Sequence, residues 1–199
     1  SALAAAKTLT AITKANPGVV SSVAHGYSNG DFVYLTVSGM SQVNGKVVRV
    51  SAVAADAFSL EGVDTTLFDT FTSGTAEKIT FGTSITTATT VNGAGGNFEF
   101  LDSTTIHANA KSSLPGLPEA STYTMDHIWD VSDAGLLAMK TASDSQAKRA
   151  FKFTFGTGGK IMVFAGYVGA ALLPGGSSQQ LVTTPTVITM DGTPTYYAS

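Results

Sequence analysis

A serine between two glycines is the first candidate for chemistry in this sequence. Residues 26–30 read GYSNG, which has the G-x-S-x-G spacing of the nucleophile elbow in α/β-hydrolases. The elbow needs a strand before the serine and a helix directly after it. Residues 31–37 (DFVYLTV) instead alternate like a strand, so we interpret Gly26 and Gly30 as turn residues and Ser28 as non-catalytic. An enzyme that uses Ser28 is the alternative, which a serine-directed activity probe would detect.

A second motif is similar to the end of a phosphate-binding loop. Residues 156–160 read GTGGK, but the first glycine of the G-x-x-x-x-G-K-[ST] pattern would fall on Thr154. Ile161 occupies the position that the pattern requires to be serine or threonine. Alternating Phe151, Phe153 and Phe155 come before the glycines, so we predict a hairpin turn between two strands.

The histidines and the absence of cysteine argue against a metal or thiol site. His25, His107 and His127 are far apart and lack the H-x-x-x-H spacing of a metal-binding helix. We expect His25 to bond with Asp31 across the turn, and His127 to be packed or to lie at an interface. The chain has no cysteine, which excludes zinc–thiolate sites and a cysteine nucleophile. We predict no metal, no cofactor and no catalytic residue.

The composition favours a subunit that neighbours cover. The 199 residues suffice for one domain, or one domain with a small second module. Charged residues make up only 13%, about half the usual quarter, and the net charge of −3 disfavours a basic nucleic-acid binder. The most apolar stretch, residues 161–175, is too short for a membrane span. Residues 1–10 lack the features of a signal peptide, and we expect them to form a flexible arm.

Short alternating segments predict a small β module over residues 11–80. Its strands are expected at residues 31–37, 46–53 and 56–62, with Asn44-Gly45 as a turn before the second of them. A second domain is expected over residues 81–199.

The second domain is also expected to consist mostly of strands. Residues 92–96 (NGAGG) predict a flexible loop, and residues 98–106 predict a strand. Residues 112–122, with two prolines, predict another loop, and residues 121–130 a strand with Tyr123 and His127 on one face.

One helix and two strand pairs complete the expected elements. The helix is predicted over about residues 132–142, with Ser132 as its N-cap. One strand pair flanks the glycines at 156–159, and a last pair is expected around Asp191-Gly192.

Two segments resemble proteins of phage virions. Residues 15–50, with the A-x-P-x-V-V opening followed by AHGYSNGD, GM and NGK, resemble a small β module that recurs in these proteins. Residues 101–125, 151–168 and 182–198, together with the single helix, resemble the major tail tube protein of long-tailed (siphovirus-like) phages. This resemblance implies a mainly β fold, a β-sandwich or barrel with one flanking α-helix, plus the small N-terminal β module.

The resemblance also implies a structural role. In that family, hexameric rings stack into a tube through which DNA is ejected from the capsid. The implied partners are further copies of the chain, a tape measure protein inside the tube, and the tail terminator and distal tail proteins. DNA would pass transiently, and no membrane would be involved. The implied location is the phage tail, after assembly in the cytoplasm of the bacterial host. The alternative is another virion protein, such as a capsid decoration protein or a tail adaptor or terminator.

Two groups of residues are expected to carry this role. Residues 111–119 contain two exposed leucines, which would be a liability on a free surface, so we expect contacts between subunits or rings there. The residues concerned are Leu114, Pro115, Gly116, Leu117 and Pro118. Inward bases would hold DNA phosphates, so we expect an acidic inner wall formed by Glu99, Asp102, Asp126 and Asp130. The N-terminal module is expected on the outside of the tube.

Overall fold

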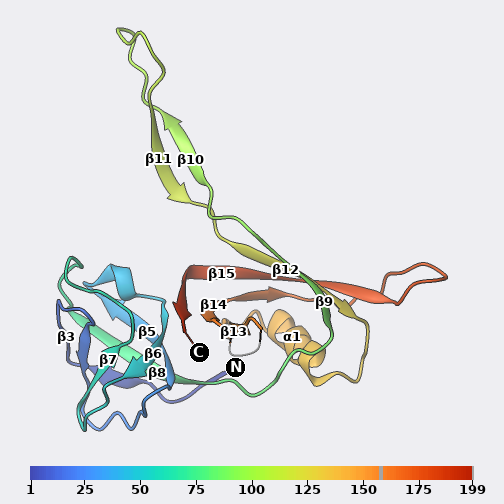
Figure 1. Ribbon diagram of the computed structural model, residues 1–199, viewed down its shortest axis with the longest axis horizontal. Helices are drawn as coiled ribbons and strands as arrows, with labels where there is room; N and C mark the ends of the chain where they lie inside the picture. Colours follow the sequence, from blue (N-terminus) through green and yellow to red (C-terminus); the bar gives the residue numbers. More distant parts are fainter. Residues whose placement is uncertain (157–158, 199) are drawn as a thin grey trace.

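The structure is a computed structural model that describes residues 1–156 and 159–198. It is mainly β, with antiparallel sheets and one α-helix, as the sequence predicts. Figure 1 shows an N-terminal β body, a second sheet beside it, and a long hairpin that projects away from both.

The N-terminal body is a β-barrel. Its sheet runs in the order β8 (Ser73–Thr80), β5 (Phe32–Ser38), β6 (Val47–Ser51), β7 (Ala57–Leu60) and β4 (Val19–Ser21). The three strands predicted in this region are thereby confirmed. Their alternation places Val33, Leu35 and Val37 in one apolar core with Phe58 and Leu60 of β7.

The expectation of a flexible N-terminal arm is wrong. β1 (Ala2–Leu3) and β2 (Lys7–Leu9) pair with β8, and β3 (Ala11–Ile12) pairs with β4 at the opposite edge of the sheet. Residues 7–12 therefore join the two edges and close the barrel. The physical reason is that Leu9 and Ile12 bury their side chains in the barrel core, which small neighbouring residues concealed in the sequence pattern.

The second body is a five-stranded antiparallel sheet. Its order is β13 (Arg149–Thr154), β14 (Ile161–Gly169), β15 (Thr183–Tyr197), β12 (Thr122–Ile128) and β9 (Ala88–Ala94). The predicted hairpin of β13 and β14 and the predicted strand β12 are confirmed. Part of the turn between β13 and β14, residues 157–158, lies outside the described residues.

Two expectations in this sheet are wrong. Asp191-Gly192 does not separate a pair of strands, because β15 continues through it with a register shift opposite Val163 and Ala165. Gly192 has a φ of +89°. A glycine with positive φ is found in β-bulges as well as in turns, so the Asp-Gly pair alone did not distinguish the two. The flexible loop expected at residues 92–96 is partly strand, since β9 extends to Ala94 before Gly95 and Gly96 lead the chain away.

The single helix, α1 (Ala134–Asp144), packs on one face of this sheet. Leu136, Met139 and Ala142 are buried, the last two against Met162 and Phe164 of β14. The N-cap is Asp133, whose carboxylate accepts the Leu136 N–H at 2.8 Å, so the expected cap at Ser132 is wrong. Ser132 instead donates its hydroxyl to Asp130 at 2.6 Å.

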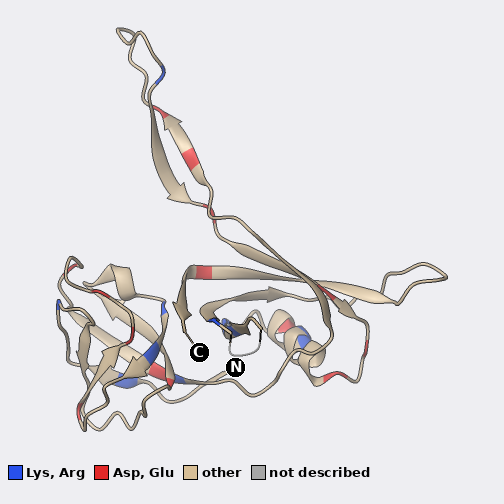
Figure 2. Cartoon of the chain, in the orientation of Figure 1, with Lys and Arg blue, Asp and Glu red and all other residues tan. Residues whose placement is uncertain are grey.

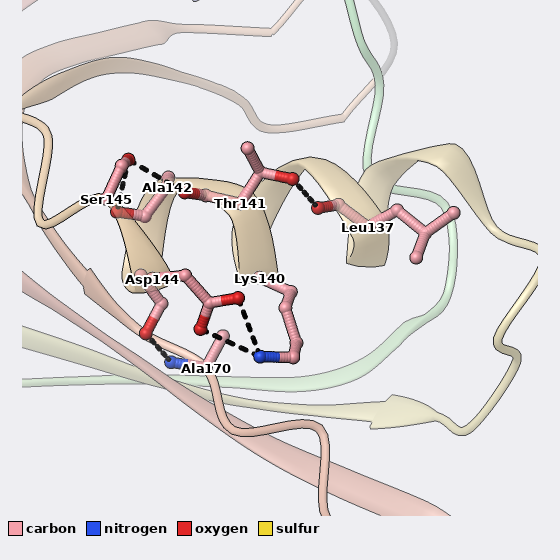
Figure 3. Close-up of polar contacts among 8 residues, drawn as sticks. Leu137, Lys140, Thr141, Ala142, Asp144, Ser145 and Ala170 are labelled. Carbon is pink, nitrogen blue, oxygen red and sulfur yellow. Dashed lines mark hydrogen bonds and ion pairs between the residues drawn. The ribbon is translucent and has the colours of Figure 1, made fainter.

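The C-terminal end of α1 is tied to β14 by polar contacts, which Figure 3 shows. The hydroxyl of Ser143 accepts the N–H of Ala170 at 3.1 Å, just after β14 ends. Lys140 forms an ion pair with Asp144 at 2.7 Å, one turn further along the helix. Ser145 donates its hydroxyl to the carbonyl of Thr141 at 2.7 Å. The Ser145 hydroxyl thereby adds a second donor to a carbonyl in the last turn of the helix, which also accepts the Ser145 N–H.

The projecting element is a two-stranded hairpin of β10 (Phe98–Asp102) and β11 (Ser113–Pro118). The strand expected over residues 98–106 is confirmed for residues 98–102, but the loop expected over residues 112–122 is wrong. β11 is an edge strand on one side, which is where a strand tolerates prolines. Pro115 lies opposite Phe100, and Pro118 lies opposite Phe98.

Candidate assembly surfaces

Ser28 lies in a turn that holds the start of β5, as the sequence predicts. The carboxylate of Asp31 accepts the Ser28 N–H at 2.8 Å, and the Asp31 N–H returns to the Ser28 carbonyl at 3.1 Å. Gly26 and Gly30 have φ values of +71° and +88°, which glycine adopts without strain. This geometry positions the backbone, and the Ser28 hydroxyl forms no hydrogen bond to a histidine or carboxylate within residues 1–156 and 159–198.

The expected bond between His25 and Asp31 is wrong. His25 is buried against the rings of Tyr27 and Phe58, where its Nε2 contacts the Ala54 carbonyl at 3.0 Å and its Nδ1 accepts the Tyr27 N–H. Asp31 instead forms an ion pair with Lys78 of β8 at 2.7 Å. His25 therefore packs the barrel.

His127 is packed, as expected. It is fully buried on β12, with its Nε2 2.9 Å from the Thr186 hydroxyl and its Nδ1 3.3 Å from the Thr87 hydroxyl. Burial lowers the pKa of His127, and the negative charges of Asp126 and Asp133 oppose that shift only in part. The neutral imidazole therefore fits this site, where two hydroxyls share its ring nitrogens.

The described part of the chain has neither a cluster of metal-ligating side chains nor a helix that could span a membrane. Residues 1–156 and 159–198 contain no group of three His, Asp or Glu side chains placed to hold a metal ion. No helix in these residues has the length and apolar character to cross a membrane.

The β10–β11 hairpin exposes apolar side chains on both of its faces. Cross-strand pairs Phe100–Pro115 and Leu101–Leu114 are adjacent, and adjacent pairs of a β-ribbon point to opposite faces. Phe100, Leu101 and Leu114 are each at least 60% exposed. An isolated two-stranded ribbon is marginally stable in water, and apolar patches of this kind mark contact surfaces.

The residues expected at a subunit contact, Leu114 to Pro118, all lie on β11 in this hairpin. Leu117 is 88% exposed, and Ile106 near the tip is 96% exposed. Gly116 has a packing reason, because a Cβ there would lie 2.9 Å from the carbonyl oxygen of Glu99. The structure brings these five residues together on the part of the molecule that projects furthest, while the contact itself stays a prediction.

The four acids expected on an inner wall lie in three different places (Figure 2). Glu99 and Asp102 are exposed on β10 of the hairpin. Asp126 lies on β12, on the sheet face opposite α1, where it accepts the Thr90 hydroxyl at 2.7 Å. Asp130 precedes α1 and is exposed. Hydrogen bonds from Thr104 and Ser132 lower the pKa of Asp102 and Asp130 respectively, so both stay ionised near neutral pH.

The two edges of the five-stranded sheet differ in character. All seven residues of β9 are exposed, and none of them is charged or proline. Natural edge strands usually carry charged residues or proline, which prevent pairing with another chain. Because β9 has neither, its edge is open to strand addition. β13, at the other edge, carries Arg149 and Lys152.

A third apolar cluster joins the barrel to the sheet. Val47 and Ile79 of the barrel pack with Val163, Ala165 and Tyr197 of the sheet. The hydroxyl of Thr195 also bonds to the Val47 carbonyl at 2.5 Å. The barrel therefore rests on β14 and the end of β15, and the two bodies share a buried interface.

An ion pair closes the edge of this interface. Lys148 pairs with Asp191 of β15 and donates to the Tyr34 hydroxyl of β5 at 3.1 Å. The bond to Asp191 raises the pKa of Lys148 above its ordinary value. Sequence reasoning missed these contacts, because more than a hundred residues separate Lys148 from Tyr34 and no local motif marks either one.

Comparison with known proteins gives a family for most of the chain. Residues 38–199 match the family model described as "Phage tail tube protein, TTP". The matched region starts at the last residue of β5, so it includes β6, β7 and β8 of the barrel together with the whole five-stranded sheet. No curated protein matches the chain.

Proposed function

Because the chain belongs to the phage tail tube protein family, we propose that it polymerises as hexameric rings that stack into a tube for DNA ejection. Its structural role in the tail follows from the family. The observation that supports polymerisation best is the β10–β11 hairpin, whose two apolar faces have no partner within the described subunit. The open edge of β9 supports strand pairing between neighbours, since ring closure is how a repeated sheet removes its edges.

The hairpin is the proposed contact between rings. Leu114, Pro115, Gly116, Leu117 and Pro118 would lie against a neighbouring subunit, where burial of the two leucines would stabilise the assembly. Its length supports this placement, because it extends beyond both β bodies (Figure 1).

The inner wall of the tube is proposed to be acidic or neutral. DNA carries about one negative charge per 1.7 Å of its axis, so inward bases would hold phosphates and slow its passage. Asp126 is the most suitable of the four expected acids, because the exposed positions around it on β12 and β15 are uncharged. Glu99, Asp102 and Asp130 remain proposals for the same role. An inner surface dominated by lysine or arginine in a map of the assembled tube would refute this proposal.

The remaining partners follow from the proposed tube. A tape measure protein would fill it during assembly in the host cytoplasm, and tail terminator and distal tail proteins would cap its ends. The barrel is proposed to lie on the exterior, since its strands close on themselves and leave little edge for a neighbour.

Negative-stain electron microscopy of the purified protein tests the central proposal. We expect tubes with a regular axial repeat and sixfold rings in end views. The second candidate, a capsid decoration protein or a tail adaptor or terminator, would give isolated rings or trimers at the same concentration. Labelling of Ser28 by a serine-directed probe would support the enzymatic alternative. We expect that the probe does not label Ser28.

A further inference from the structure

We propose that the tip of the β10–β11 hairpin of one copy docks beside the end of β12 in a second copy. In this contact Ile106 of the first copy lies against Trp129 and Val182 of the second. The proposal rests on the polymerisation proposed above, and it names the surface that receives the hairpin. We call residues 103–112 the tip, and Trp129 with Val182 the receiving pair.

The tip presents an apolar side chain from a preformed turn. Ile106 is 96% exposed, and the turn that contains it is closed by a hydrogen bond from the Ala108 N–H to the Thr105 carbonyl at 3.0 Å. Behind this turn the Ser103 N–H donates to the Ser112 carbonyl at 2.9 Å. Because these bonds already hold the backbone of the tip, docking it costs less conformational entropy than ordering a free loop would.

The receiving pair offers a fixed aromatic surface. The backbone N–H of Trp129 donates to the Val182 carbonyl at 2.9 Å, and its indole N–H donates to the Leu172 carbonyl at 3.1 Å. The preceding ladder pair is Ile128 with Thr183, so Trp129 and Val182 are the next cross-strand pair and share one face. Trp129 is 37% exposed and Val182 is 43% exposed. A held tryptophan of this kind is a typical anchor of protein interfaces.

The tip and the receiving pair belong to opposite ends of the same strand. The hairpin leaves the sheet where Thr122, the first residue of β12, pairs with Ala94, whereas Trp129 directly follows Ile128, the last residue of β12 (Figure 1). These two ends of β12 are about 20 Å apart. A stack repeats one contact between two different surfaces, so the two surfaces must lie at opposite ends of the subunit. The tip and the receiving pair meet this requirement.

The charges around the two surfaces are of opposite sign. The tip carries Lys111 and no acid. Residues 128–139, on the receiving side, carry Asp130 and Asp133 and no base, and residues 161–190 carry no charge at all. Asp133 is engaged in capping α1, so Asp130 is the exposed acid that Lys111 would meet.

The apolar and the charged contacts have different roles. Burial of Ile106 against the indole supplies affinity, while Lys111 and Asp130 favour one orientation of the tip. Screening limits charge interactions to about 8 Å at physiological salt, so this selection acts only in close contact. Asp102, at the base of the tip, accepts the Thr104 N–H at 2.8 Å and so uses its carboxylate within its own hairpin.

Disulfide cross-linking tests the contact in the full-length protein, which has no cysteine of its own. In tubes of the double variant Ile106→Cys/Val182→Cys, mild oxidation should join each copy to the next and give a ladder of covalent oligomers on a non-reducing gel. Unassembled subunits should give no ladder. The matched control is Ile106→Cys/Leu67→Cys, because Leu67 is 94% exposed on the barrel, and it should give no ladder either.

Substitutions at the two surfaces give a second readout. Ile106→Asp and Val182→Asp are each expected to keep the fold, by circular dichroism, and to raise the concentration needed for assembly at least about tenfold. Lys111→Glu should raise it severalfold, and Lys111→Glu/Asp130→Lys, which has the net charge of the wild type, should restore it. An Asp130 that pairs with Lys111 lies at the contact between rings, so recovery would also place Asp130 away from the bore.

The possible failures separate the two proposals. Tubes of the Ile106→Cys/Val182→Cys variant that give no ladder, an equal ladder from the control, or normal assembly of Ile106→Asp would overturn the docking of the tip. Failure of Lys111→Glu/Asp130→Lys to recover would overturn the pairing of Lys111 with Asp130. Absence of tubes from the wild type would instead refute the proposed function.

Discussion

Tyr197 and Arg49 form a direct contact between the end of the five-stranded sheet and the barrel. The Tyr197 hydroxyl accepts the backbone N–H of Arg49 at 2.8 Å, and the Arg49 guanidinium lies 4.8 Å from the centre of the Tyr197 ring. Arg49 is itself held by an ion pair with Glu61, which directly follows β7 of the barrel. The two residues lie 148 positions apart in the chain, so this contact forms only when both bodies have folded.

Tyr197→Phe is expected to destabilise the subunit by about 1 kcal/mol, because it removes one hydrogen bond and leaves the Arg49 N–H without its acceptor. Tyr197→Ala should cost about 3–5 kcal/mol, since it also empties a buried aromatic site. Urea unfolding of the unassembled subunit measures both. Tyr196→Phe is the matched control, because Tyr196 is 69% exposed, and it should change stability little. Equal effects at the two tyrosines would contradict the role of this contact.

Leu117→Asp is expected to leave a folded monomer that does not polymerise. The side chain is exposed in the subunit, so the substitution should change the free energy of unfolding by less than about 0.5 kcal/mol. Sedimentation velocity measures assembly, and circular dichroism measures the fold. Leu67→Asp is the control, because Leu67 is 94% exposed on the barrel. Deletion of residues 114–117 should also prevent assembly, and tubes of normal length from either hairpin variant would refute the proposed contact.

An epitope inserted between Thr66 and Leu67 should be accessible along the whole length of the tube. These residues lie in the exposed loop between β7 and β8, and the barrel is proposed to face outward. Immuno-electron microscopy with a monoclonal antibody checks this prediction. Labelling restricted to the open ends of tubes would indicate that the barrel faces the lumen.

The stability of the subunit is expected to fall as the pH falls below about 6.5, the ordinary pKa of histidine. Burial lowers the pKa of His127, so the unfolded state binds a proton more readily than the folded state does. The loss should be roughly 1 kcal/mol for each unit by which the pKa is lowered. Urea unfolding at pH 7 and pH 5 measures it. His127→Gln should reduce this pH dependence, whereas His107→Gln, near the exposed hairpin tip, should retain it.

The elements with regular alternation were predictable from the sequence. Strands β5, β12 and β13 repeat apolar residues at every second position, and that pattern directly reflects one buried face. β14 is instead a continuous apolar run, because both of its faces are buried. The helix was predictable for the same reason at its own period, although Asp133 rather than Ser132 caps it. Ser132 and Asp133 are both suitable N-cap residues, and the backbone conformation before the helix determines which side chain reaches the free N–H groups.

The hairpin and the interface were less accessible to such reasoning. β11 carries Pro115 and Pro118, which are typical of a loop, and its apolar residues have no buried face within the subunit to set an alternation. The contacts of Tyr34, Arg49 and Tyr197 join distant parts of the chain, so no local pattern marks them. The exposed leucines of β11 were still recognisable as unusual, because two apolar residues next to prolines and glycine have no place in a small core.

Closure of the barrel by residues 7–12 sets an order for folding during synthesis. β2 leaves the ribosome before its partner strand, because the partner residues on β8, such as Ala76 for Lys7, are made about 70 residues later. Leu9 therefore lacks its strand partner until translation reaches β8, whereas Ile12 pairs with Val20 of β4, which is made only a few residues after it. Once β8 is complete the barrel can close, while the five-stranded sheet is still unmade. The folded barrel would then expose Val47 and Ile79 as an apolar surface. β14 can pack on this surface as soon as it leaves the ribosome.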